Sequence, residues 1–182
     1  MSLIRVVRGG ACVLMIAALT LISASSAEAG PTNGDKEALA SAKEYLNSQA
    51  FSMKGLIAQL DSPDGGQFTV AQATYGVDHA GVNWYKEAIL SAKQYLQSQA
   101  FSLKGLIAQL DSPDRGQFTV AQATYGTDHT GANWNKEALL SAKEYLSTPA
   151  FSLSGLIAQL DSPYGGQFTV AQATYGATTA YK

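Results

Sequence analysis

Three copies of one fifty-residue sequence make up most of the chain, and any fold must accommodate this repetition. Residues 36–85 are identical to residues 86–135 at 40 of 50 positions, without a gap. A third copy begins at Lys136 and matches the second at 33 of 41 positions up to Gly176, after which ATTAYK ends the sequence. A period of this length is typical of repeated small structural units. We therefore expect a short linker at 30–35 and three modules at 36–85, 86–135 and 136–182.

The apolar residues within each copy have helical rather than alternating spacing. In the first copy, one stripe at intervals of three and four residues consists of Ala38, Leu39, Ala42, Tyr45 and Leu46, and a second consists of Met53, Leu56, Ile57 and Leu60. Such stripes predict two amphipathic helices. Asp35 is the expected cap of the first helix, and Ser52 is the expected cap of the second, which should stop near Asp61 before Pro63. The fold class is therefore all-α.

A short third helix is predicted after the proline turn of each copy. Thr69 and Gln72 have the spacing of a capping box, which predicts a helix start at this point. Val70, Ala73 and Val77 are expected to share its apolar face, and Gly76 either ends the helix as a left-handed residue or weakens its last turn. Three short helices per copy predict modules that resemble helix-turn-helix units.

The two tryptophans lie where one copy passes into the next. Trp84 and Trp134 precede the expected first helix of the following copy, so each is predicted to pack on that helix, at Ile89 or Leu139, as a hydrophobic staple. Tyr85 is a poor helix cap, and Asn83 is an alternative cap that would start the helix earlier. Pro149, which replaces Gln49 and Gln99 of the other copies, marks the expected end of the first helix in the third copy.

The first 29 residues have the layout of a secretory signal. Two arginines precede an apolar run of twelve residues, and the segment ends in Ala27-Glu28-Ala29 before Gly30. This pattern predicts cleavage after Ala29, so that the exported chain begins at Gly30. The alternative is an uncleaved segment that anchors the chain in a membrane, although a spanning helix needs about 20 apolar residues. We expect no stable membrane span in the mature chain.

Charge and composition restrict the possible partners and chemistry. The whole chain has a formal net charge of −2, and loss of residues 1–29 leaves ten basic against thirteen acidic residues, or −3. A chain without a basic surface is not expected to bind nucleic acid. The single cysteine, Cys12, and the two histidines provide too few ligands for a cysteine- or histidine-based metal site. No cofactor is predicted.

Several residue pairs could suggest catalysis, but ordinary structural roles explain them. Asp78-His79 and Asp128-His129 could form part of a metal or acid–base site, but copy three has Ala177-Thr178-Thr179 instead, which favours solvated loop residues. Asp61-Ser62 and its repeats lie beside a proline turn without a histidine partner, which favours turn formation. Catalytic, metal and cofactor residues are therefore predicted to be absent.

The aromatic residues recur with the repeat and have two possible roles. A recognition surface or core and staple packing could account for Tyr45, Tyr95, Tyr145, Tyr75, Tyr125, Tyr175, Trp84 and Trp134. For any single ring, packing is the favoured interpretation. The sequence therefore assigns no specific partner-binding residue.

The motifs KEALxSAKxYL, FSxKGLIxQL and VNWNKEAL resemble the family of host cell surface-exposed lipoproteins, which carry Ltp-like helix-turn-helix repeats. The resemblance covers almost all of residues 36–176. It implies small helical units on exported proteins of Gram-positive bacteria and their temperate phages, where phage-borne members are linked to superinfection exclusion. Family members carry a lipobox cysteine just after the apolar stretch, whereas Cys12 lies at the beginning of that stretch here. The family's third helix is also more charged than FTVAQATYG.

Together these features predict a secreted or cell-surface, non-enzymatic repeat protein that binds a partner at the cell envelope. Its partner would be an envelope or phage protein, with superinfection exclusion as one version of the function. A structural or adhesive module associated with the cell wall is the alternative. Tandem weak sites raise avidity without new contacts, which gives the triplication a use in either setting.

Overall fold

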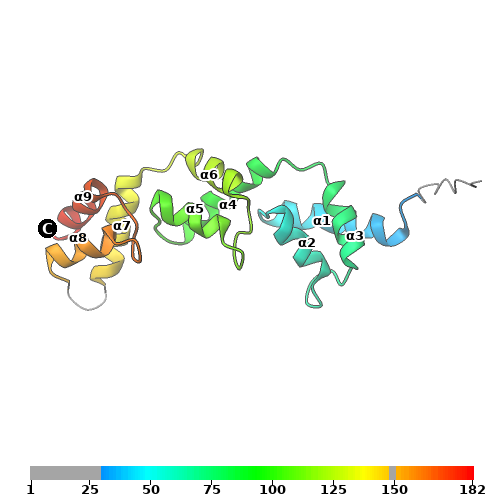
Figure 1. Ribbon diagram of the computed structural model, residues 1–182, viewed down its shortest axis with the longest axis horizontal. Helices are drawn as coiled ribbons and strands as arrows, with labels where there is room; N and C mark the ends of the chain where they lie inside the picture. Colours follow the sequence, from blue (N-terminus) through cyan, green and yellow to red (C-terminus); the bar gives the residue numbers. More distant parts are fainter. Residues whose placement is uncertain (1–29, 148–150) are drawn as a thin grey trace, which may run out of the picture. The chain divides into compact units, whose positions relative to one another are not determined.

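The computed structural model describes residues 30–147 and 151–182, and within these residues it is helical without any strand. Its helices are α1 (Asn33–Ser48), α2 (Met53–Asp61), α3 (Val70–Asp78), α4 (Trp84–Ser98), α5 (Leu103–Asp111), α6 (Val120–Asp128), α7 (Trp134–Leu146), α8 (Leu153–Asp161) and α9 (Val170–Ala180). Each repeat contributes three of them (Figure 1). The all-α prediction is confirmed. Ala27, Ala29 and Pro149 lie outside the described residues.

The first helix of each repeat starts at a polar cap. Thr32, rather than the expected Asp35, caps α1: its hydroxyl accepts the backbone N–H of Asp35, and the Asp35 carboxylate accepts the backbone N–H of Thr32 at 2.7 Å. Asp35 thus completes a capping box, a role that its acidic side chain suits in a first turn. Asn83 caps α4 as the poor capping ability of Tyr85 predicts, and Asn133 caps α7. The helix α1 therefore includes residues 33–35.

The second helix and the turn after it follow the sequence signals closely. The hydroxyl of Ser52 accepts the backbone N–H of Gly55 at 3.0 Å, and α2 ends at Asp61, two residues before Pro63. The backbone N–H of Phe68 then donates to the carbonyl of Leu60 at 3.0 Å. Met53, expected on the apolar stripe, is instead 37% exposed, because it is the first residue of the helix and faces outward.

The third helix starts at the predicted capping box of Thr69 and Gln72, but its apolar face differs from the expectation. Ala73 and Val77 are buried, whereas Val70 is 59% exposed, since it lies on the first turn beyond the core. Gly76 neither ends the helix nor adopts a left-handed conformation. It is buried inside α3, where a Cβ atom would lie 2.6 Å from the carbonyl carbon of Ala38 in α1. Only a glycine permits this approach of the two helices.

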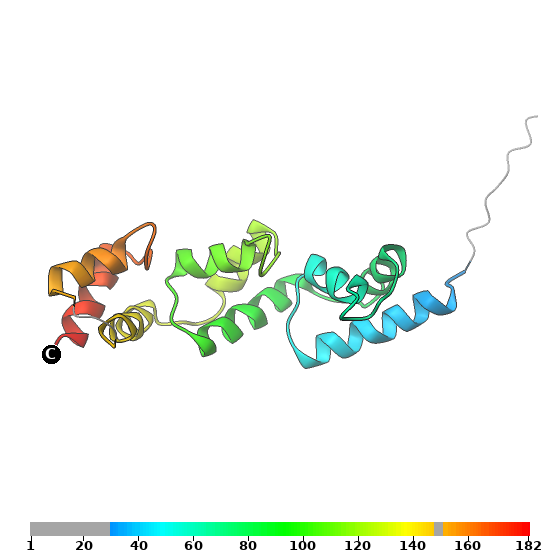
Figure 2. The ribbon, with the colours of Figure 1, turned by 90° about the horizontal axis from the view of Figure 1, so that it is seen from below.

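Each repeat has its own hydrophobic core. In the first repeat, two fully buried leucines of α2 pack with alanines of α1 and α3, and α1 runs beneath the pair α2 and α3 (Figure 2). The second and third repeats contain equivalent clusters around Leu106 and Leu110 and around Leu156 and Leu160. All extensive helix–helix packing in the described residues occurs within a repeat. The three modules are therefore independent units of packing.

Two side chains link each repeat to the next. Trp84 is the first residue of α4, not the residue before its cap, and it packs against the core of the preceding repeat. Trp134 does the same at the second junction. The expected staples onto Ile89 and Leu139 are therefore replaced by contacts across the junction, because Asn83 and Asn133 place the tryptophans inside the helices. The carboxylate of Glu87 also accepts the backbone N–H of Phe51 across this junction.

Candidate functional site: the repeated outer surface and the repeat junctions

The outer face of the third helix presents the same uncharged side chains in every repeat. The exposed valine at its first position is 59%, 61% and 62% exposed at Val70, Val120 and Val170. An exposed alanine follows each valine, and a tyrosine lies five residues after it. Tyr125 and Tyr175 are also exposed. We call this set of valine, alanine and tyrosine the outer face of the repeat. It is the apolar surface that the fold presents three times.

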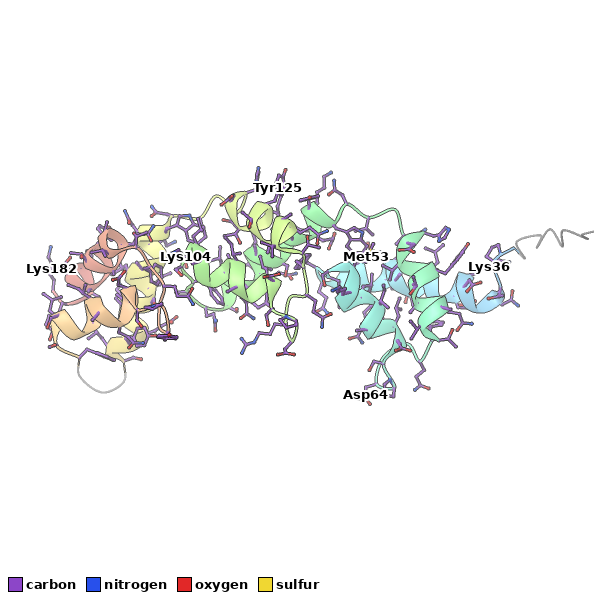
Figure 3. The ribbon with its side chains drawn as sticks, in the orientation of Figure 1. Lys36, Met53, Asp64, Lys104, Tyr125 and Lys182 are labelled. Carbon is purple, nitrogen blue, oxygen red and sulfur yellow. The ribbon has the colours of Figure 1, made fainter. Side chains whose placement is uncertain are left out.

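A cluster of rings enlarges the outer face in the middle repeat. The imidazole of His129 stacks on Tyr125 with ring centroids 3.8 Å apart, and Tyr85 of α4 meets the same ring edge-on at 5.1 Å. Figure 3 shows Tyr125 on the outside of α6. The first repeat has only the stack of His79 on Tyr75. Exposed tyrosine is typical of binding surfaces because it offers a large rigid contact area with a polar end.

The recurrent Asp-His pairs are placed on this surface as exposed residues. Nδ1 of His79 lies 2.8 Å from the carbonyl oxygen of Tyr75, so its ring is held by its own helix. His129 makes the same contact with Tyr125. Within residues 30–147 and 151–182, no three histidine, cysteine or carboxylate side chains gather where a metal ion could bind. These histidines have an aromatic neighbour rather than a set of ligands.

The Asp-Ser pair before each proline has a structural role in the turn. The backbone N–H of Asp64 donates to the hydroxyl of Ser62 at 3.2 Å, and the Ser62 carbonyl accepts the backbone N–H of Gln67. Asp61 is exposed at the end of α2, and Asp64 extends from the tip of the turn (Figure 3). The geometry supports the turn interpretation.

The aromatic residues divide into packed rings and exposed rings, apart from Tyr75, which is half-buried and stacks on His79. The half-buried rings of Tyr45, Tyr95 and Tyr145 pack against the cores, and each meets a phenylalanine edge-on at 5.7–6.0 Å. For these rings and the two tryptophans, core packing is confirmed, although the tryptophans pack on the preceding repeat and not as staples. The packing interpretation is wrong for Tyr125 and Tyr175, which are exposed because they lie on the outer side of the third helix of their repeats.

Each junction buries one carboxylate oxygen, from Glu87 at the first junction and from Glu137 at the second. Glu137 is only 8% exposed, and one of its carboxylate oxygens is buried without a hydrogen-bond partner. Burial raises the pKa of Glu137, and the hydrogen bond from the Phe101 backbone opposes this rise. Burial raises the pKa of Glu87 at the first junction in the same way. Glu37, at the equivalent position of the first repeat, is exposed. This side chain is half-buried at Glu87 and buried at Glu137, in the two repeats that follow another repeat.

A pair of equivalent clefts crosses the junctions, one cleft at each junction. The first has a volume of about 540 Å³ and the second about 700 Å³. One wall comes from the start and outer side of α2 or α5, the other from the first helix and the turn of the next repeat. Amide, hydroxyl and aromatic side chains form most of the lining. Each cleft therefore requires two consecutive repeats.

The sequence pattern of the host cell surface-exposed lipoproteins matches residues 33–80, 83–130 and 133–179. The chain belongs to this family. The three matched segments each hold one complete set of three helices, so the family's unit coincides with the unit of packing. Comparison with curated proteins and with solved structures finds no match. Among the described residues, no helix of this family member is long and apolar enough to cross a membrane.

Proposed function

We propose that this protein acts at the cell surface as a non-enzymatic binding protein that engages a partner of the cell envelope through several repeats at once. The threefold presentation of the outer face supports the proposal most directly. Three linked surfaces of identical chemistry convert weak single contacts into high avidity, because the second and third contacts form at a high effective concentration. Membership in a family of surface-exposed lipoproteins supports the location.

Avidity can be tested in the full-length chain by removing the surfaces one at a time. Val70→Glu, Val120→Glu and Val170→Glu change exposed residues at the first position of a helix, where a negative charge is favourable. Folding should therefore be retained. Capture of components from the native envelope should fall steeply as one, two and three substitutions are combined.

A matched control changes exposed residues that lie outside the outer face. Asn47→Ser and Gln97→Ser introduce the residue that the third repeat already has at Ser147, and both positions are exposed. Their capture of envelope components should equal that of the unchanged chain. Full capture by the triple valine variant, with normal circular dichroism, would refute the assignment of the outer face.

One specific version of this function is superinfection exclusion, in which the partner belongs to an incoming phage. Cells that express the chain should then adsorb phage normally and admit less phage DNA. The triple valine variant should admit phage DNA freely at equal surface level. Equal DNA entry in cells with and without the unchanged chain, across a broad phage panel, would remove this version for the host tested.

The alternative function is a structural or adhesive role on the cell wall, and the clefts at the junctions favour it as a second candidate. Purified walls should then retain the chain in the absence of any phage component. Wall retention with unchanged DNA entry would support this role, whereas loss of DNA entry without wall retention would support exclusion.

Export is proposed to proceed by cleavage between Ala29 and Gly30, without lipid attachment. Intact-mass spectrometry of the protein from its native host should give the mass of residues 30–182. A lipid-modified Cys12, or retention of residues 1–29 on most molecules, would instead support anchoring through the N-terminal segment.

A further inference from the structure

We infer that the two junction clefts bind a neutral oligosaccharide, so that three repeats provide two glycan sites. This inference goes beyond the proposed function of the outer face. It concerns a surface distinct from the outer face, because none of the outer-face valines or tyrosines lines either cleft.

The dimensions of the clefts suit a ligand of a few sugar rings. Volumes of about 540 and 700 Å³ lie within the range of roughly 300–1,000 Å³ that is usual for small-ligand sites. Both clefts are partly open to solvent, so a longer chain can enter and continue beyond them. Because the second cleft repeats the first after fifty residues, the two clefts offer the same kind of site.

The lining favours an uncharged ligand that makes many hydrogen bonds. In the first cleft, the amides of Gln59 and Gln94 and the hydroxyl of Ser98 lie with the half-buried rings of Phe51 and Tyr95. Amides and hydroxyls both donate and accept, as the hydroxyl and acetamido groups of sugars require. Aromatic rings offer flat apolar surfaces to the C–H face of a sugar ring. Protein clefts with this combination orient neutral polar ligands.

The few charges near the clefts argue against an anionic polymer. Arg115 lines both clefts and is the basic side chain in each, where it donates to the amide oxygen of Gln109 at 2.9 Å. Glu144, the acidic side chain of the second cleft, offsets it there. A polyphosphate or nucleic acid requires several unpaired cations along its path. A neutral glycan requires none.

The junction contacts fix the walls of each cleft. The hydrogen bond from the Phe51 backbone to Glu87 and the packing of Trp84 on the first core join the two repeats that form the first cleft. Phe51 itself lines that cleft. The same arrangement recurs with Glu137 and Phe101. A wall held from both repeats is preorganised, which lowers the cost of binding.

Binding can be tested on the full exported chain with the tetrasaccharide of N-acetylglucosamine as probe. Ala58 and Ala108 are exposed residues of α2 and α5 that line the first and second cleft. Arginine has nearly the helix propensity of alanine and would fill the cleft. Ala158, the equivalent residue of the third repeat, is exposed and lines neither cleft, so Ala158→Arg is the matched control.

Isothermal titration should give two tetrasaccharide sites per unchanged chain. Each single variant, Ala58→Arg or Ala108→Arg, should keep one site, and the double variant should bind the tetrasaccharide at least tenfold more weakly. Ala158→Arg should bind like the unchanged chain. Absence of binding at millimolar tetrasaccharide, or equal weakening by Ala158→Arg, would overturn the inference. The inference would also be overturned if a polyphosphate bound as tightly as the tetrasaccharide. Binding of a neutral glutamine- and serine-rich peptide in the clefts, without binding of the tetrasaccharide, would overturn it as well. If the tetrasaccharide does not bind while envelope capture depends on the outer-face valines, the inference fails and the proposed function stands.

Discussion

Replacing Gly126 with alanine tests the closest helix–helix approach in the second repeat. A Cβ atom at this position would lie 2.6 Å from the carbonyl carbon, 2.7 Å from the carbonyl oxygen and 2.8 Å from the Cβ atom of Ala88. Two of these atoms belong to the α4 backbone, which cannot turn aside as a side chain can. Ordinary contact begins near 3.4 Å, so α4 must retreat by roughly 0.8 Å, the difference between 3.4 and 2.6.

The expected loss of stability follows from two opposing effects. Overpacking of this kind costs up to about 3 kcal/mol, whereas replacing a helical glycine by alanine contributes about 1 kcal/mol in favour of the helix. Gly126→Ala should therefore lower the free energy of unfolding of the second repeat by about 2 kcal/mol. Gly105→Ala is the matched control, because a Cβ atom there would lie 3.1 Å from its nearest neighbour, the hydroxyl oxygen of the Ser102 side chain. It should be neutral or stabilising by at most about 1 kcal/mol.

Urea denaturation can measure both changes in the repeat that carries them. Trp134 packs against the core of the second repeat and Trp84 against that of the first, so tryptophan fluorescence in a Trp84→Phe background reports on the second repeat. A lower midpoint with an unchanged slope is the expected result for Gly126→Ala. If Gly126→Ala and Gly105→Ala have equal stability, the reasoning from close approach is refuted.

Two further substitution sets test the core and the junctions. Leu106→Ala should lower the free energy of unfolding by about 2 to 5 kcal/mol, because Leu106 is fully buried. Ile107→Ala should cost less because Ile107 is half-buried, and Lys104→Ser should be neutral because Lys104 is exposed. Chemical denaturation can check this order. Burial raises the pKa of Glu87 in the folded chain above its ordinary value of 4.5. Between the unfolded and the folded pKa, the folded chain therefore binds more protons than the unfolded chain. The free energy of unfolding should then fall as the pH rises through this interval. Glu87→Gln should remove this dependence in pH-resolved denaturation, whereas Glu37→Gln at the exposed equivalent position should leave it unchanged.

Local signals in the sequence predict the helix ends well, because capping involves residues three apart. Ser52, Thr69 and Asn83 act as caps, and α2 stops before Pro63 as expected. The repeat period likewise predicts modules of three helices. Thr32 was missed as the first cap, although the acidic residue three positions later is the signal of a capping box.

The spacing of apolar residues within one helix does not predict features that depend on contact with other helices. Val70 fits the apolar stripe of its helix but lies outside the core, and Gly76 is required by the approach of a helix that is distant in sequence. Gln67 adopts a left-handed backbone with φ of 53°, which the adjacent glycines did not reveal. The burial of Glu87 and the two clefts depend on contact between repeats. From the sequence, the candidate site could therefore be predicted only as a set of side chains that recurs in each repeat.

The confinement of each hydrophobic core to one repeat has a mechanical consequence for a protein at a cell surface. Under tension between its ends, a chain built this way can lose one core while the other two keep their packing. Its extension would then proceed in discrete steps of about fifty residues, each dissipating energy before the next repeat gives way. Pulling on the envelope would lengthen the protein without releasing all of its binding surfaces at once.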